Sequence, residues 1–276
     1  MASSALLPLS SSSASRRQAL RAAAALGLMA VLPLSAQARL ALSSAINRTA
    51  RNRALSQRIA KAYAQLLLGV FPDRAREIIN TARQLVRAGF DEMAQQEWPA
   101  DVAKLLAELR TQSDRLDALI VQAPTKDSVV QVAVQADRML DAANAATLAL
   151  EKLSQAGTAK LVNLAGRERM LSQRLAKNYN LQAVHPDSKA VRDILASDAL
   201  EFKRGLDELG KTPISTPAIR TQLELAQGQW VFFDAALQRQ ADARGLEAVA
   251  TTSERLLEVT NRLTDLYELA LKEVLG

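Results

Sequence analysis

The sequence predicts an all-α protein built from two tandem antiparallel four-helix bundles. Three observations predict this fold. The composition favours helix, since Ala, Leu, Gln, Arg and Glu dominate while only 4% of the residues are aromatic. Apolar residues recur at spacings of three and four, and alternation typical of strands is missing. Finally, a long segment recurs 116 positions further along the chain, which indicates an internal duplication.

Residues 1–38 are predicted to be an export signal. Arg16, Arg17 and Arg21 precede an apolar run over 22–34, and the small-residue sequence Ala-Gln-Ala at 36–38 resembles a cleavage site. The run of about 13 residues is too short to span a bilayer. The paired arginines favour the twin-arginine route over the general one, although Ala19 stands where that motif usually has Phe. We expect a soluble periplasmic protein; an uncleaved N-terminal anchor is the alternative.

Two copies of one domain are expected after this signal, over residues 39–155 and 156–276. The segments 46–63 and 162–179 are identical at 10 of their 18 positions. The same shift aligns the shorter segments 89–93 (Gly-Phe-Asp-Glu-Met) and 205–209 (Gly-Leu-Asp-Glu-Leu). Because the spacing is steady over about a hundred residues, a duplication explains it better than chance.

Prolines divide each copy into four predicted helices, because proline breaks a helix interior. Six prolines lie beyond the predicted signal, all of them between apolar-periodic stretches. The junction 154–158 contains a single glycine, which leaves open a continuous helix that joins the two copies. The expected helices cover residues 41–70, 73–97, 101–122, 128–153, 158–184, 188–209, 218–241 and 246–275.

The composition removes most catalytic and metal chemistry. There is no cysteine and only one histidine, His185, so disulfides, thiolate sites and His-based catalytic pairs are excluded. No Glu-x-x-His pair, phosphate-binding loop or nucleophile motif occurs. We therefore expect no enzyme, no cofactor and no metal. His185 is expected at the surface, Trp98 and Trp230 in cores or at helix ends, and Phe232 and Phe233 in the core.

Positive charge is concentrated in the two repeated segments. Together they hold nine basic residues and one acid, Glu168. The predicted signal holds three of the 35 basic residues. The chain that remains outside the signal and the two repeated segments is therefore slightly acidic. Acids at helical spacing that would pair these arginines are nearly absent, and the arginines recur in both copies. We interpret the two segments as basic helix faces with a function. The modest net charge and the export signal argue against a nucleic-acid partner.

The segment Asn163–Lys177 resembles the opening helix of the N-terminal domain of type IV pilus methyl-accepting chemotaxis transducers, the PilJ-type domain. It is also similar to the anion-recognising segment of nitrate/nitrite sensor kinases. The sensor domain of those kinases is a periplasmic four-helix bundle in which paired arginines hold an anion between signature helices of two subunits. The resemblance implies a similar domain here. By motif position, the candidate ligand-binding residues are Arg58 and Arg174 as the anion-facing arginines, Arg53 and Arg169 as the earlier motif arginines, Gly166, and the neighbouring Asn47, Asn163, Arg51 and Arg167.

Two functions from different classes remain open on this basis. The first is a periplasmic sensing module that binds a small oxyanion, with nitrate or nitrite as first candidates, either within one chain or across a homodimer. The second is a helical scaffold or protein-interaction module of a pilus or chemoreceptor complex, with the basic helices docking an acidic partner. Family receptors continue into a membrane span and cytoplasmic modules that do not follow here. We therefore expect a periplasmic or inner-membrane signalling partner.

Overall fold

The computed structural model describes residues 36–157, 159–212 and 216–275, nearly all of them helical. The prediction of an all-helical fold is confirmed, since these residues contain no strand. The predicted export segment lies outside the described residues up to residue 35, and its last three residues begin the first described helix. In the described part of the chain, every helix is too short or too polar to cross a membrane.

Eight helices are described, and each corresponds to one predicted from the sequence. They are α2 (Ala36–Leu68), α3 (Pro72–Met93), α4 (Ala100–Leu119), α5 (Lys126–Ser154), α6 (Ala159–Val184), α7 (Lys189–Gly210), α8 (Pro217–Leu237) and α9 (Ala243–Leu275).

Prolines and polar caps begin several of these helices. Pro72 opens α3 directly after Phe71, whose φ of 44° turns the chain away from α2. Thr125 and Ser128 cap the start of α5 reciprocally, so that two otherwise free N–H groups find acceptors. At the start of α8, Thr216 accepts from the N–H of Ile219. Local chemistry thus explains why the helix starts were predictable.

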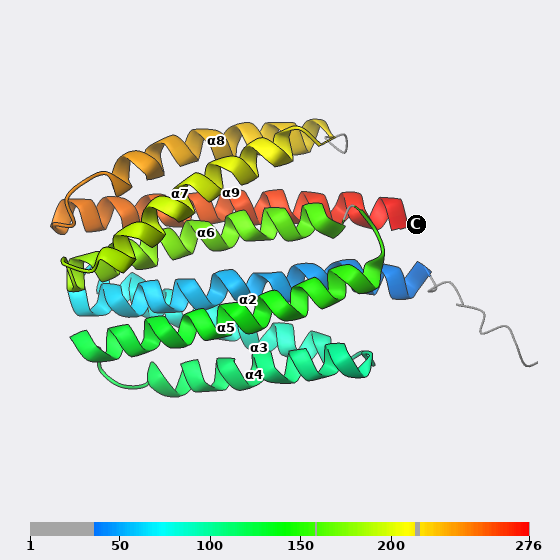
Figure 1. Ribbon diagram of the computed structural model, residues 1–276, viewed down its shortest axis with the longest axis horizontal. Helices are drawn as coiled ribbons and strands as arrows, with labels where there is room; N and C mark the ends of the chain where they lie inside the picture. Colours follow the sequence, from blue (N-terminus) through cyan, green and yellow to red (C-terminus); the bar gives the residue numbers. More distant parts are fainter. Residues whose placement is uncertain (1–35, 158, 213–215, 276) are drawn as a thin grey trace, which may run out of the picture. The chain divides into compact units, whose positions relative to one another are not determined.

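The expectation that one continuous helix joins the two predicted copies is wrong. Helix α5 ends at Ser154, and Gln155 adopts a left-handed conformation with a φ of 54°. The chain turns there, and α6 begins four residues later and runs beside α5 instead of extending it (Figure 1). The Gln155 conformation ends the helix without the glycine that usually occupies such a position.

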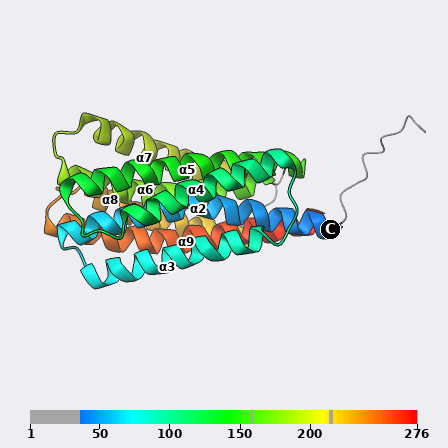
Figure 2. The ribbon, with the colours of Figure 1, turned by 90° about the horizontal axis from the view of Figure 1, so that it is seen from below.

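Helices α2 and α6 pack side by side, and we call them the signature helices (Figure 1). Helix α2 also packs on α3 and α5, with α4 against α5; α6 packs on α7 and α9, with α8 against α9. Most helices lie roughly parallel or antiparallel to one another, while α7 runs at an angle to them (Figure 1 and Figure 2). Two crossed contacts, α2 with α9 and α5 with α6, correspond to each other in the two halves.

The apolar core has two parts, and the signature helices enter both. One cluster is built mainly from α6–α9 but includes Leu42 and Ile46 from the start of α2. The other is built mainly from α2–α5 but includes Leu181 and Val184 from the end of α6. Each half therefore completes the core of the other, and the contacts make residues 36–276 one unit.

The aromatic residues follow the sequence prediction with one exception. Trp230 stacks on Phe202 with ring centroids 4.5 Å apart, and Phe233 is fully buried beside it. The half-buried Trp98 donates its indole N–H to the Met93 carbonyl at 2.8 Å. Phe232 is 64% exposed, so its predicted place in the core is wrong. Adjacent positions on a helix point in different directions, and of these two residues only Phe233 faces the core.

Candidate ligand site between the signature helices

Arg53 of α2 and Arg169 of α6 are the two largest fully buried side chains of the described structure. They occupy corresponding positions in the repeated segments. Among the described residues, neither guanidinium has a carboxylate within ion-pair distance. Buried cations without an acidic partner are rare, because desolvation of the charge is costly.

The hydrogen bonds of these two arginines correspond closely. Arg53 donates to Asn144 Oδ1 on α5 and to the backbone carbonyl of Asn163 on α6, both at 3.1 Å. Arg169 donates to the backbone carbonyl of Asn47 on α2 at 3.4 Å. Each guanidinium therefore reaches across to a carbonyl of the opposite signature helix.

The correspondence is not complete. Arg169 donates to Asn261 Oδ1 on α9 at 3.4 Å, as Arg53 does to Asn144, but its further bond to Asn47 Oδ1 at 3.2 Å has no counterpart among the hydrogen bonds of Arg53 in the described structure. Its Nε has no acceptor, whereas Arg53 Nε reaches the Ala50 carbonyl at 3.4 Å. Arg169 thus keeps a donor that nothing in the described structure satisfies.

The two guanidinium groups converge beside Gly166. A Cβ placed on Gly166 would lie 3.1 Å from Arg53 Nη2 and 3.6 Å from Arg169 Nη2. It would also lie 3.2 Å from the Cβ of Ala50, which holds the corresponding position in α2. The glycine therefore provides the room in which the signature helices approach and both arginines fit.

Burial changes the acidity of both arginines. Desolvation, followed by the charge of Arg167, lowers the pKa of Arg53 to about 9. Desolvation, followed by the charges of Arg51 and Arg53, lowers the pKa of Arg169 to about 9. Both groups are still charged at neutral pH. Two like charges are thus held close together in a dry interface.

Arg58 and Arg174, the expected anion-facing arginines, each have a carboxylate partner instead. Arg58 pairs with Glu254 of α9 through two nitrogens. Arg174 pairs in the same two-pronged way with Asp198 of α7, which is 1% exposed. Although burial lowers the pKa of Arg174, its hydrogen bonds and charge interaction with Asp198 raise it overall.

The signature lysines are also buried and paired, in corresponding ways. Lys61 Nζ lies 2.5 Å from Glu254 on α9, and Lys177 Nζ lies 2.6 Å from Asp137 on α5. Lys61 additionally donates to Gln173 Oε1 on α6 at 2.8 Å. Each lysine therefore ties its signature helix to the last helix of the other half.

The four remaining candidate residues lie toward the start of the signature helices and contact acids. Asn47 donates to Glu268 at 2.5 Å and Asn163 to Glu151 at 2.5 Å. Arg51 lies 3.8 Å from Asp265, and Arg167 pairs with Glu201. Of the four, Asn47 accepts from Arg169 through Oδ1 and through its backbone carbonyl, and Asn163 accepts from Arg53 through its backbone carbonyl.

These contacts correct the prediction that the repeated segments display basic faces. Much of each segment is buried between helices, and most of its charged residues are paired. The acids were overlooked because they come from other helices, up to 214 residues away. Helical spacing reveals only partners on the same helix.

Glu168 is a buried charged residue whose environment the sequence did not reveal. It is fully buried in α6, neither carboxylate oxygen has a hydrogen-bond partner, and it lies directly against Gly205 of α7. Desolvation, followed by the charge of Glu201, raises the pKa of Glu168 well above its ordinary value of 4.5. The corresponding residue in α2 is Asn52, so this feature is confined to the second half.

A pocket of about 250 Å³ between α2, α6 and α9 reaches Arg169. Arg51 and Arg58 of α2, Arg169 of α6 and Asp265 of α9 contribute its charged lining. Three cations against one acid make this pocket locally positive, and it provides a route by which a small anion can approach Arg169.

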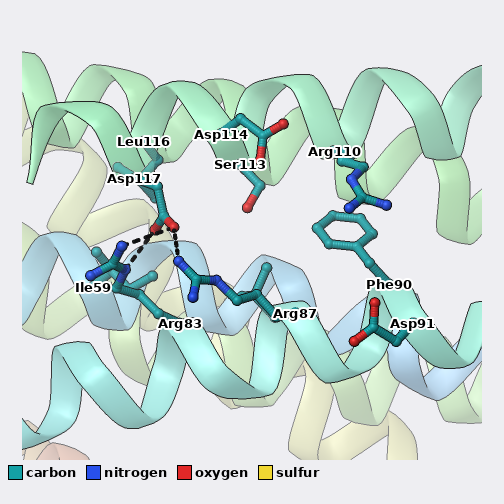
Figure 3. Close-up of a pocket in the computed structure, with 11 residues that line it drawn as sticks. Ile59, Arg83, Arg87, Phe90, Asp91, Arg110, Ser113, Asp114, Leu116 and Asp117 are labelled. Carbon is teal, nitrogen blue, oxygen red and sulfur yellow. Dashed lines mark hydrogen bonds and ion pairs between the residues drawn. The ribbon is translucent and has the colours of Figure 1, made fainter.

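A second polar pocket, of about 240 Å³, lies between α3 and α4 (Figure 3). Asp117 accepts from Arg83 through both oxygens and from Arg87 at 3.2 Å, and the Arg110 guanidinium lies 5.7 Å from the Phe90 ring centroid. Its lining carries three arginines and three aspartates. The balanced charge gives it no preference for anions.

The fold and this site define a class: an all-helical bundle protein whose two central helices meet through buried arginines. Residues 150–261 match the family model described as the type IV pili methyl-accepting chemotaxis transducer N-terminal domain. This segment, which includes α6, is thus similar to that family's domain, and the resemblance inferred from its signature helix is confirmed there. Comparison with curated proteins and with solved structures yields no match.

Proposed function

We propose that this protein is a periplasmic, non-catalytic sensing module that binds a small oxyanion between α2 and α6, at Arg53 and Arg169. One observation carries the proposal: two fully buried guanidinium groups converge on one point with no carboxylate in contact. Guanidinium groups offer fixed, paired donors that suit planar oxyanions. Nitrate and nitrite are the first candidates, and the tandem copies would provide both halves of the site in one chain.

The choice of Arg53 and Arg169 over Arg58 and Arg174 follows from their partners. An anion at Arg58 or Arg174 would have to displace a buried carboxylate, at a cost of several kcal/mol. An anion at Arg53 and Arg169 would instead relieve an existing cost. The fall of each pKa from 12.5 to about 9 corresponds to roughly 5 kcal/mol of unfavourable interaction per charge, as an order of magnitude.

Calorimetric titration with nitrate, nitrite, sulfate and phosphate at constant ionic strength tests the proposal. We expect one of the planar anions to bind and to raise the melting temperature. Arg169→Lys keeps the charge but loses the paired donors, so it should weaken binding at least about tenfold. Arg83→Lys, an ion-paired arginine of α3, is the matched control and should bind as the parent protein does. No heat with any oxyanion in a folded sample would refute the proposal.

A second candidate, a protein-interaction module of a pilus or chemoreceptor complex, is favoured by the outer face of α8. Leu225, Val231 and Phe232 are 50%, 65% and 64% exposed there, and apolar faces of this kind often mark protein contacts. The paired signature residues are poorly placed to dock an acidic partner. Capture from periplasm with the parent protein and with Phe232→Glu tests this role: a partner retained only by the parent supports it, and equal capture refutes it.

A further inference from the structure

An apolar pocket of about 650 Å³ lies where α5, α6 and α7 meet. We call it the α5–α7 pocket. Its volume falls within the usual range for small-molecule sites. Its apolar wall consists of Val130 and Val134 from α5, Leu181 and Val184 from α6, and Val191 and Ile194 from α7. It lies at the C-terminal end of α6, whereas Arg169 lies in the middle of that helix.

The apolar side chains of this pocket are unusually accessible. Val134, Ile194 and Val130 are 48%, 43% and 38% exposed. Leaving several branched side chains in water within one concave site costs free energy that their burial would recover, at about 25 cal/mol per Å². A ligand with an apolar body would provide that burial.

The two halves of the chain offer an internal comparison. Asp137 of α5 and Glu254 of α9 are the acids that bind the two signature lysines, so they define how these two helices align. In this alignment, Val130 corresponds to Glu247 and Val134 corresponds to Thr251. The corresponding outer face of α9 therefore carries polar residues, as expected for a face in water. The repeated scaffold does not require valines at these positions, so the apolar lining is a particular feature of α5.

Two polar groups of the lining lack hydrogen-bond partners. Asn178 is 3% exposed, and its Nδ2 has no acceptor. His185 lines the pocket as well, and its Nε2 has no partner; the predicted surface position of this histidine is thus a partly buried pocket position. An unsatisfied buried donor such as Asn178 Nδ2 is costly, and a ligand oxygen would accept its hydrogen bond.

The charges of the lining restrict the ligand further. The lining carries two carboxylates, Asp137 and Asp187, and no lysine or arginine. Lys177, which does not line the pocket, forms an ion pair with Asp137. An anionic ligand would nevertheless meet an acidic rim. We propose that the α5–α7 pocket binds an uncharged organic molecule with an apolar body and a carbonyl oxygen that accepts from Asn178. This site is separate from the proposed oxyanion site and does not depend on it.

Fluorescence titration of the full chain with prodan, a neutral naphthyl ketone whose emission shifts to the blue outside water, tests the proposal. We expect saturable one-to-one binding with a blue shift. Val134→Glu should weaken binding at least about tenfold, whereas Leu148→Glu should leave it unchanged. Leu148 is the matched control because it is also an apolar residue of α5, is 48% exposed and lies outside the pocket.

Asn178→Leu tests the hydrogen bond separately. It should lower the affinity several-fold without lowering the melting temperature, since it removes a donor that has no partner in the unliganded protein. Unchanged affinity in Asn178→Leu would overturn the carbonyl assignment. Absence of saturable binding by the parent protein, or undiminished binding by a folded Val134→Glu variant, would overturn the site.

Discussion

Replacement of Glu168 by methionine should stabilise the protein at neutral pH. Glu168 is fully buried, and both carboxylate oxygens lack hydrogen-bond partners. Methionine has a similar length, fills irregular space well and brings no group that needs a partner. The change therefore removes a polar group whose desolvation is uncompensated, whereas most core substitutions in proteins are destabilising.

The size of the effect depends on pH. Because desolvation raises the pKa of Glu168 well above 4.5, the folded state holds this proton to higher pH than the unfolded state does. The contribution of Glu168 to stability is therefore most favourable below about pH 4.5 and falls as pH rises towards the folded pKa, by at most about 1.4 kcal/mol per pH unit. Up to pH 7 the loss is at most about 3 kcal/mol. We expect Glu168→Met to gain about 2–4 kcal/mol near pH 7 and less near pH 4.5.

Urea unfolding followed by far-UV circular dichroism at both pH values measures this difference. Glu224→Met, at an exposed position of α8, is the control and should change stability by less than about 0.5 kcal/mol. If Glu168→Met were less stable than the parent at neutral pH, Glu168 would have to be charged and solvated. A gain that did not shrink in acid would equally refute the reasoning.

Three further changes test the packing and the ion pairs. Gly205→Ala would place a Cβ into the Glu168 carboxyl group, so it should cost about 1–3 kcal/mol in thermal unfolding, and adding Glu168→Ala should recover most of that loss. Arg174→Leu would leave the buried Asp198 without its cation, at a cost of about 3–5 kcal/mol in urea unfolding. Burial alone would raise the pKa of Glu254, but its basic neighbours lower this pKa to about 2. Its stabilising contribution is therefore present above about pH 4.5 and is lost as pH falls towards 2, so Glu254→Gln should flatten this part of an acid titration.

The exposed pair of Arg76 and Asp73 provides the control for the buried pairs. Both side chains are largely in water, so Arg76→Leu should cost less than about 1 kcal/mol. If Arg76→Leu and Arg174→Leu lowered the free energy of unfolding equally, burial of Asp198 would not explain the contribution of the Arg174–Asp198 pair to stability. If the double variant Gly205→Ala, Glu168→Ala were as unstable as Gly205→Ala alone, the packing of helices α6 and α7, and not the Glu168 carboxyl group, would limit the space beside Gly205.

The helices were predictable from the sequence because their determinants are local. Pro72 and Pro217 open helices, and the spacing of apolar residues marks the buried faces. The site was less predictable because its determinants are distant. Arg58 meets Glu254 across 196 positions, and nothing in the local pattern distinguishes Arg58, which has an acid partner, from Arg53, which has none. The left-handed Gln155 between α5 and α6 was missed because glycine is the residue that usually announces such a turn.

The recurrence of the signature residues now has two different explanations. Gln57 and Gln173 each donate to a backbone carbonyl of the last helix in their own half, at 3.2 and 3.0 Å. Tyr63 and Tyr179 donate in the same way to carbonyls at the connections that precede those helices. Packing alone accounts for residues of this kind, because each satisfies a polar group that the fold requires.

Arg53 and Arg169 are different, because an uncompensated buried charge is a poor way to stabilise a helix pair. Replacement of buried charged groups by apolar residues of similar volume is often neutral or stabilising by about 1–4 kcal/mol. We therefore expect the double variant Arg53→Met, Arg169→Met to unfold at the same or higher urea concentration in the absence of oxyanions, and to show no stabilisation by nitrate or nitrite. A large loss of stability without any oxyanion would instead mean that the arginines serve the α2–α6 interface itself, and their recurrence would then need no ligand to explain it.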